Sequence, residues 1–501
     1  MGFYVVPRSV NLAEHACDDA RTADFSPELG AADSVERFQP ASGDVKFSYS
    51  VIWRESDTRW RYRFEPLLSM NTHDVETNWF SITNAVLVLT AISFVVGLIL
   101  LRLLRRDLLR YAELEELLLY DDIERSKHEF AGGGPRPQGE SFGGWKTVAN
   151  DVFRAPPCAG LLCVCVGTGA QVFVAALLLL TVSLTGVFSP ANRGAFTTTA
   201  IVLYTLLGFV GGYCAVLLRM KLSQSKESIL RVSVGTAMVF PGLLFLLFIA
   251  LNVLAGNRGS SGAVPLGTVM FMLLLWLGVN LPSSVVGSFF AYRHIKHEVV
   301  KKKWPTKTNL IARAIPPVPW WQNRYVMGFM LGIVPFLVSF AQLFFVVSKM
   351  LLHQFVYVRP PGEAPGPRGA PSATALTPPA APARPAAALR YMHGFLFIVF
   401  WLLTISSAEV SLIAVYTSLS CEDYRWWWQS FITPATSGVD MLLAMAAFFT
   451  VTFTSIPTTV ALLMLGHLVM LTLIWMLFTG TVGFMTSLAV VNLIYGAVKA
   501  D

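Results

Sequence analysis

We expect one carboxylate, Glu409, to lie inside a membrane span, within residues 406–411, which read SSAEVS. A charged side chain at the middle of a bilayer costs at least about 2.5–3.5 kcal/mol on insertion scales, so such residues face the interior of a helical bundle. The chemistry open to Glu409 is contact with a proton, a cation or a polar group of another membrane protein. The alternative is a protonated carboxyl group that hydrogen-bonds a neighbouring helix, and the sequence leaves both open.

Three consecutive tryptophans, Trp426, Trp427 and Trp428, follow the short polar stretch 421–425. Tryptophan favours the membrane interface, where its apolar ring and its polar N–H each find a suitable environment. We therefore predict that these three residues form an interfacial aromatic anchor.

The last four residues contain Lys499 and Asp501, a basic residue two positions before an acid. Charges of both signs in a short exposed tail can be read by charge-assisted hydrogen bonds. This pair is a candidate sorting signal for a cytosolic coat.

Signatures of enzymes are missing from the sequence. It contains no P-loop, nucleophile elbow, HExxH motif or Rossmann fingerprint. His294 and His297 lie in a basic segment beside Glu298 and are interpreted as surface imidazoles. The six cysteines do not form a disulfide framework, and small residues in packed helices explain Cys163 and Cys165 better than a metal site does. We expect no catalytic residue, no cofactor and no metal.

The composition indicates which elements position these residues. Apolar residues make up 54% of the 501-residue chain and charged residues 14%, whereas a soluble domain carries about 25% charged residues. The net charge of +7 arises from Lys and Arg clustered beside apolar runs. That placement follows the positive-inside rule and does not indicate a nucleic-acid partner. The partner that this composition requires is the lipid bilayer.

Apolar runs long enough to cross a bilayer, about 20 residues each, recur along the chain. The predicted spans are 78–104, 159–188, 196–218, 232–255, 265–291, 326–350, 392–418, 436–456 and an apolar stretch 459–498. The last stretch is long enough for one span with a tail or for two short spans, with Gly480 and Gly483 near its middle. The predicted fold class is an all-α, polytopic bundle of about nine transmembrane helices. Pro241, Pro282 and Pro335 interrupt spans and are expected to kink them.

The charges flanking the spans predict the topology. Asp74 and Glu76 precede the first span and four arginines follow it, so the N-terminus is expected outside the cytosol and the loop 105–158 inside it. Loops 219–231 and 292–325 are rich in Lys and Arg, whereas loops 189–195 and 256–264 hold one Arg each. Nine spans would leave the C-terminus in the cytosol.

Two further segments complete the predicted domain organisation. Residues 1–77 carry no apolar run and form a short lumenal segment, with a candidate strand at 47–53; residues 78–501 form the membrane domain. Residues 360–388 are rich in Pro and Ala and cannot bury enough apolar surface to fold, so they are expected to be a disordered lumenal insertion.

Several sequence blocks together resemble the nonaspanin family, also called the transmembrane 9 superfamily or endomembrane protein 70 family. They cover most of the chain in a specific order. The blocks are 73–82 (HDVETNWFSI), 144–146 (GWK) with 151–154 (DVFR), 189–194 (SPANRG), 265–268 (PLGT), 308–311 (TNLI), the Glu409 segment, 421–428 (CEDYRWWW) and 478–484 (FTGTVGF).

The resemblance implies a lumenal N-terminal domain, nine spans and a cytosolic tail whose Lys-any-Asp/Glu signal holds the protein in the Golgi through coatomer. Lys499 and Asp501 match that signal. The family is associated with sorting and surface delivery of other membrane proteins. This sequence departs from the family in a shorter lumenal portion without a signal peptide and in the insertion 360–388.

Two functional hypotheses follow. The first is a non-enzymatic trafficking factor of Golgi and endosomal membranes that contacts transmembrane cargo proteins and recruits coatomer through its tail. The second is a secondary transporter or channel that uses Glu409. A membrane enzyme is disfavoured because the sequence lacks a catalytic constellation.

Overall fold

The computed structural model describes residues 144–185, 187–188, 194–222, 228–257, 263–298, 304–306, 308–355, 385–452 and 458–497, together with scattered positions between 83 and 116. The chain divides into two units, 1–72 and 73–501, and every described residue belongs to the second. The candidate strand 47–53, residues 360–384 of the insertion and the tail residues Lys499 and Asp501 lie outside the described residues. Residues 385–388, which were expected to be disordered, form the first turn of helix α10 (Pro385–Ser420).

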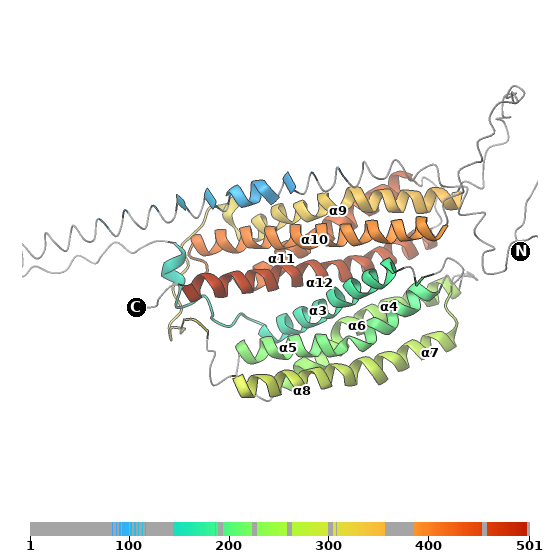
Figure 1. Ribbon diagram of the computed structural model, residues 1–501, viewed down its shortest axis with the longest axis horizontal. Coiled ribbons are helices and arrows are strands. Elements are labelled where there is room, and N and C mark those ends of the chain that lie inside the picture. The colour runs from blue at the N-terminus through green and yellow to red at the C-terminus, as the bar shows by residue number, and fades with distance from the viewer. Residues whose placement is uncertain are drawn as a thin grey trace, which may run out of the picture. The chain divides into compact units, whose positions relative to one another are not determined.

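The described chain is helical throughout, apart from turns and connecting segments (Figure 1). The described positions between 83 and 116 are all helical. The elements that follow are η5 (Trp145–Val148), α3 (Ala159–Leu184), α4 (Ala195–Leu206), α5 (Gly208–Leu222), α6 (Ser228–Gly256), α7 (Leu266–Leu275), the π-helix η6 (Trp276–Asn280), α8 (Leu281–Glu298), η7 (Trp320–Gln322), α9 (Arg324–Phe355), α10 (Pro385–Ser420), α11 (Trp426–Thr452) and α12 (Thr458–Ala497).

The predicted fold class is confirmed. Seven described helical segments are long and apolar enough to cross a membrane, counting α4 with α5 and α7 with α8 as one segment each. In α9, the described apolar part is Arg324–Phe340, and the first predicted span, 78–104, contains the helical positions between 83 and 102. Each predicted span therefore corresponds to helix in the part of the chain that the structure describes.

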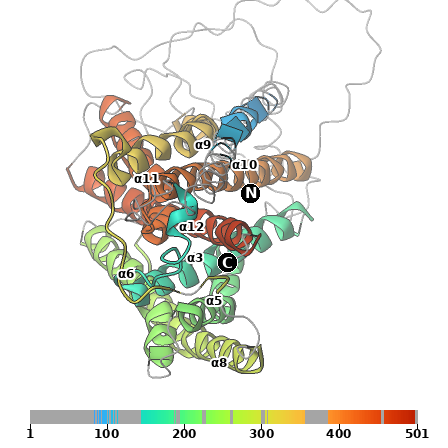
Figure 2. The ribbon, with the colours of Figure 1, turned by 90° about the vertical axis from the view of Figure 1, so that its left-hand side faces the viewer.

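The helices pack as two neighbouring groups that α3 joins. In one group α5 packs against α3, α6 and α8. In the other, α10, α11 and α12 pack against one another and α9 packs against α10 and α11. Helix α3 contacts α10 and α12 as well as α5 and α6, and Figures 1 and 2 show it between the two groups.

Small residues allow the closest of these contacts. A Cβ atom on Gly208 would lie 2.5 Å from Asn280 Oδ1, and one on Gly212 would overlap the backbone carbonyl of Ser284 on α8. The pair therefore brings the backbones of α5 and α8 together, as small residues four apart do in membrane helices.

Prolines inside helices leave backbone carbonyls that other helices satisfy. Pro241 has no N–H, so the carbonyl of Ala237 has no donor within α6; the Trp276 indole N–H donates to it at 2.8 Å. Pro434 frees the carbonyl of Ser430 in the same way, and the Ser411 hydroxyl lies 2.9 Å from it. These two prolines thus convert backbone groups into contacts between helices.

Helix α11 corrects the predicted span 436–456. It begins at Trp426, ten residues earlier, and the preceding connection is only Cys421–Arg425. Some of the polar residues that interrupt the apolar run are bonded to neighbouring helices; the Ser418 hydroxyl, for example, donates to Gln429 Oε1 at 2.8 Å. Interhelical hydrogen bonds allow a span to contain such residues.

The apolar stretch 459–498 forms one helix, which decides between the two alternatives. Helix α12 has 40 residues, about 60 Å at 1.5 Å per residue, about twice the thickness of a bilayer core. Gly480 and Gly483 lie within it, and a Cβ atom at these positions would lie 2.9 Å from Phe431 and 2.6 Å from Pro434. They mark the close approach of α11 and not a break in the helix.

Candidate functional site

Glu409 lies on α10, half-buried, on the side of this helix that faces the first predicted span. Ser93 of that span lies near its carboxyl group. The carboxyl oxygen Oε2 is buried and has no partner among the described residues. An ionisable group with a free oxygen in the membrane region is the best candidate for a functional contact.

A second carboxylate, Asp440, was missed by sequence reasoning. It lies on α11, fourteen residues after the helix begins, and its Oδ2 atom is also buried without a partner among the described residues. The expectation that Glu409 is the one carboxylate inside a span is therefore wrong. The available signal was an Asp at the fifth position of the predicted span 436–456.

On the opposite face of α10, Ser411 is hydrogen-bonded, whereas the buried hydroxyl of Ser407 has no partner among the described residues. The Ser411 hydroxyl lies 3.0 Å from the Gly483 carbonyl oxygen and 2.8 Å from Ser487 Oγ, in addition to its contact with α11. This small network fastens α10 to α11 and α12. Glu409 differs from its polar neighbours on α10 in being ionisable.

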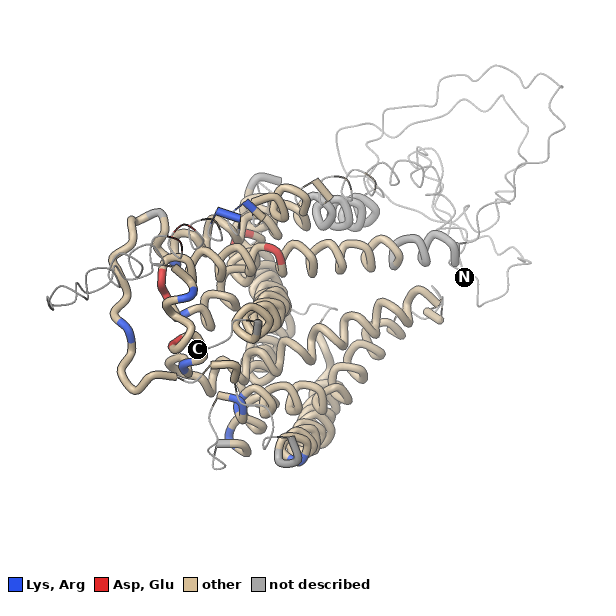
Figure 3. The backbone as a smooth tube through the Cα atoms, turned by 60° about the vertical axis from the view of Figure 1, so that its left-hand side comes forward, with Lys and Arg blue, Asp and Glu red and all other residues tan. Residues whose placement is uncertain are grey.

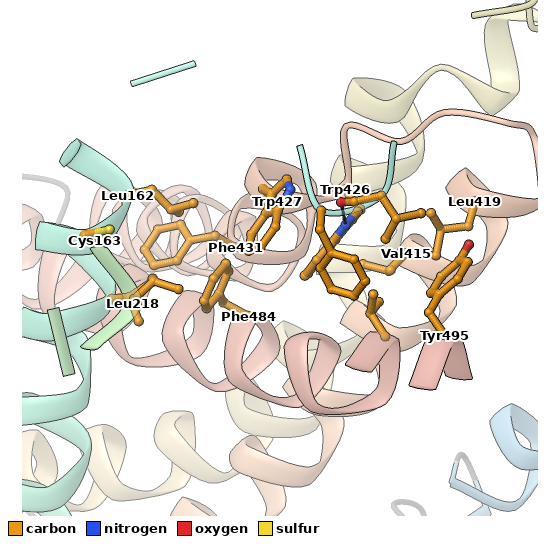
Figure 4. Close-up of a cluster of buried hydrophobic side chains, with 14 of the residues drawn as sticks. Leu162, Cys163, Leu218, Val415, Leu419, Trp426, Trp427, Phe431, Phe484 and Tyr495 are labelled. Carbon is orange, nitrogen blue, oxygen red and sulfur yellow. Dashed lines mark hydrogen bonds between the residues drawn. The ribbon is translucent and has the colours of Figure 1, made fainter. Parts of the chain in front are cut away.

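Trp426 and Trp427 are buried, 0% and 1% exposed, and stack on each other with ring centroids 4.3 Å apart. Figure 4 shows both rings inside a cluster with Phe431 and Phe484. An interfacial anchor must face lipid headgroups, so the predicted anchor role is corrected for these two residues: they pack the core. Trp428 is half-buried, and for this residue the anchor role stays a prediction.

Indole and phenol groups fasten the segment 145–157 beneath α11 and α12. The Trp426 N–H donates to the carbonyl of Val152 at 3.0 Å, and the Trp428 N–H to that of Pro157 at 2.8 Å. The hydroxyl of Tyr495, near the end of α12, donates to the carbonyl of Trp145 at 2.8 Å. We use the name charged-end junction for the segments 144–157, 304–324 and 421–425 together with Tyr495. Figure 3 shows most of the described charged residues at this end of the bundle.

Glu422 occupies a strained position in this junction. The N–H of Asp423 donates to the carbonyl of Ser418 and that of Glu422 to Leu419, the pattern of a Schellman motif that ends α10. Its left-handed position, normally filled by glycine, is held by Glu422 with φ 61°. For a residue with a Cβ atom this conformation costs about 1–2 kcal/mol.

The Glu422 side chain has contacts that offset this strain. Its Oε1 accepts a hydrogen bond from the Gly144 N–H at 3.1 Å, and its Oε2 lies 2.7 Å from Arg313 Nη2. Three segments far apart in sequence therefore meet at one carboxylate. Glycine would relax the backbone here but would remove both links.

Asp151 joins two of these segments, 144–157 and 304–324, at a second point. This 3% exposed carboxylate pairs with Arg154 at 2.6 Å and lies 3.4 Å from the backbone N–H of Arg313. The Arg154 guanidinium also donates to the carbonyl of Asn309 at 2.8 Å. The stacking of Phe153 on Trp304, 4.6 Å between centroids, adds an apolar contact.

Four of the sequence blocks that carried the family resemblance meet in this junction. They are 144–154, 308–311, 421–428 and, through Phe484, 478–484. Sequence reasoning found the blocks but did not predict their convergence. Glu409 lies away from the junction on the α10 face toward the first span, so the structure does not bring it together with the tryptophans.

The cysteines and possible metal ligands are the remaining candidate residues. Cys158 is exposed and Cys163 is buried, and both are free thiols. Within the described ranges, no group of three or more His, Cys, Asp or Glu side chains could hold a metal ion. Burial and the neighbouring Asp423 raise the pKa of the Cys421 thiol, so this group stays protonated and weakly nucleophilic.

These features define a polytopic α-helical membrane protein with a charged junction at one end of its bundle. The profile of the family described as Endomembrane protein 70 matches residues 1–360 and 386–460. The human transmembrane 9 superfamily member 4 is 32% identical over 500 residues, covering 100% of this chain and 68% of the relative. Member 10 from Arabidopsis thaliana is 32% identical over 458 residues, covering 91% of this chain and 62% of the relative.

The chain therefore belongs to the endomembrane protein 70 family, whose relatives carry the name transmembrane 9 superfamily. It spans about two thirds of the length of these relatives. No solved structure matches it.

Proposed function

We propose that this protein is a non-enzymatic, multi-pass protein of Golgi and endosomal membranes that sorts other transmembrane proteins. The proposal rests on the family and on one observation, the carboxyl oxygen of Glu409 that has no partner on the face of α10 toward the first predicted span. A polar or basic group in the transmembrane segment of a cargo protein would satisfy that oxygen. A charge-assisted hydrogen bond in a low-dielectric region is strong enough to select such a segment.

A secondary transporter or channel is the second candidate. The observation that favours it is Asp440, which adds a second carboxylate with an unpartnered oxygen to the same group of helices. Ionisable residues within spans mark proton and ion pathways in other membrane proteins. The two candidate functions differ in one measurable property: a transporter or channel carries protons or ions across the membrane, and a sorting protein does not.

The proposal includes a sided topology, with the charged-end junction and the C-terminal end of α12 in the cytosol and residues 360–388 in the lumen. We expect a glycosylation acceptor introduced within 360–388 to receive a glycan. An acceptor introduced at Leu310, which is 101% exposed, should receive none, because that loop would never meet the lumenal transferase. The measurement is the glycosidase-sensitive shift of each variant on a gel. A glycan at Leu310 would reverse the proposed orientation.

The tail prediction tests the Golgi location. Replacing Lys499 and Asp501 by Ala is expected to move the protein from the Golgi to endosomes, lysosomes or the cell surface, because coatomer would lose its two charged contacts. The signal follows closely after Tyr495, whose ring is held in the junction, so the two substitutions should leave the fold intact. The measurement is steady-state localisation of an internally tagged protein. As a control, the exchange Lys499→Arg should retain the protein in the Golgi; Golgi residence of the double Ala variant would rule out the signal.

A further inference from the structure

Residues 314–319 form an extended connection that is fastened at both ends. At one end the Arg313 N–H donates to Asp151 and its guanidinium pairs with Glu422 at 2.7 Å. At the other end the Gln322 N–H donates to the carbonyl of Pro319 at 3.0 Å, and η7 leads directly into α9. Within the described part of the chain, the backbone of 314–318 forms no hydrogen bond to another segment.

The sequence of this connection favours one backbone conformation. Proline fixes φ near −65° at Pro316, Pro317 and Pro319, and Ile315 and Val318 each precede a proline, which disfavours the helical region. Pro319 has φ −60° and ψ 155°, close to the polyproline II values of about −75° and +145°. Polyproline II lacks internal hydrogen bonds, in agreement with the bare backbone seen here.

The proline face of the connection is open. Pro316, Pro317 and Pro319 are exposed, Val318 is 40% exposed and the adjoining Trp320 is 77% exposed. The connection belongs to the charged-end junction and so lies at the end of the bundle where charged side chains gather (Figure 3).

We propose that Pro316–Pro319 is a docking site for a cytosolic domain of the WW class, which binds polyproline II helices in a groove lined with aromatic side chains. Prolines spaced three apart, exposed and already in the bound conformation, are the ligand such grooves recognise. Preorganisation removes most of the ordering cost that a flexible proline-rich tail would have on binding. The inference rests on the proposed orientation, which places the junction in the cytosol.

The ion pair at Arg313 decides between two kinds of proline-binding domain. An SH3 domain gains much of its affinity from a basic residue beside the two prolines, which enters an acidic pocket. Arg313 stands three residues before Pro316, but its guanidinium is held by Glu422 and lies 3.4 Å from the Thr147 carbonyl. A domain that reads the prolines alone is therefore the occupant that fits.

The test uses the purified full-length protein in lipid nanodiscs and, as probe, a WW domain that recognises Pro-Pro-x-Pro ligands. We expect saturable binding by biolayer interferometry, weakened by about tenfold or more when Pro316 and Pro319 are replaced by Ala. The matched control replaces Pro378 and Pro379 by Ala, which changes two prolines of the predicted insertion and should leave binding unchanged. The thermal midpoint of each variant shows whether the fold is intact.

Three outcomes would overturn the proposal: absence of binding, equal binding by the Pro316→Ala, Pro319→Ala variant, or tighter binding of an SH3 probe than of the WW probe. The last would mean that Arg313 is free for recognition. Because the assay uses purified protein, its result does not depend on cargo sorting or on Golgi residence, so failure here is distinguishable from failure of the proposed function.

Discussion

Replacing Trp427 by Ala is expected to lower the free energy of unfolding by about 3–5 kcal/mol, the usual cost of removing a large aromatic side chain from a packed core. The ring is 1% exposed, stacks on Trp426 and lies edge-on to Trp304 with centroids 6.0 Å apart. Its loss would open a cavity where α11, α12 and the charged-end junction meet. The measurement is the thermal midpoint and the monodisperse yield of the detergent-purified protein.

The exchange Trp320→Ala provides the matched control, since that ring is 77% exposed at the same end of the bundle. Surface substitutions usually change stability by less than about 0.5 kcal/mol. Two thermal midpoints that fall by equal amounts would contradict the burial of Trp427 and would restore the interpretation of the cluster as an interfacial anchor.

The helices themselves could be predicted from the sequence because a bilayer requires long apolar runs. The predicted spans 159–188, 232–255 and 392–418 agree closely with the apolar helical segments Ala159–Leu184, Ile229–Gly256 and Gly394–Ser420. Helix α11 could not be bounded in this way. Its first turns contain Gln429, Ser430 and Pro434, which lower the hydropathy of the run. Whether such residues are tolerated depends on partners from other helices, such as Ser411 and Ser418.

The charged-end junction was beyond sequence reasoning for a related reason. Arg313 and Glu422 are 109 residues apart, and Gly144 and Glu422 are 278 apart. Periodicity and flanking charge report on local structure and sidedness, not on which loops meet. The left-handed conformation of Glu422 also contradicts local preference, since a glycine or asparagine is expected there. A residue that violates a local rule and is compensated by distant contacts is typical of a constrained functional position.

The exchange Glu409→Gln is expected to leave insertion and thermal stability unchanged, because a neutral amide of nearly equal volume is less costly to bury than a carboxylate. It should weaken cargo binding by about ten- to a hundredfold, since a hydrogen bond to a charged group contributes about 1.5–3 kcal/mol. Two measurements check this: the surface or endosomal delivery of a co-expressed transmembrane protein that the wild-type protein sorts, and proximity labelling of neighbours in the membrane.

Asp440→Asn is the matched control, because it neutralises the other carboxylate with an unpartnered oxygen in the same helices. Under the sorting proposal the contact with cargo lies at Glu409, beside Ser93 on the first span, so the Asp440→Asn variant should still deliver cargo. Liposomes containing the wild-type protein should then show no proton- or ion-coupled flux. A transporter gives the opposite pattern: flux in the wild-type protein that both neutralising exchanges abolish, because a pathway with two carboxylates needs each of them to change protonation or to hold the ion. Normal sorting by Glu409→Gln, together with absent flux in the wild-type protein, would reduce Glu409 to a packing residue beside Ser93.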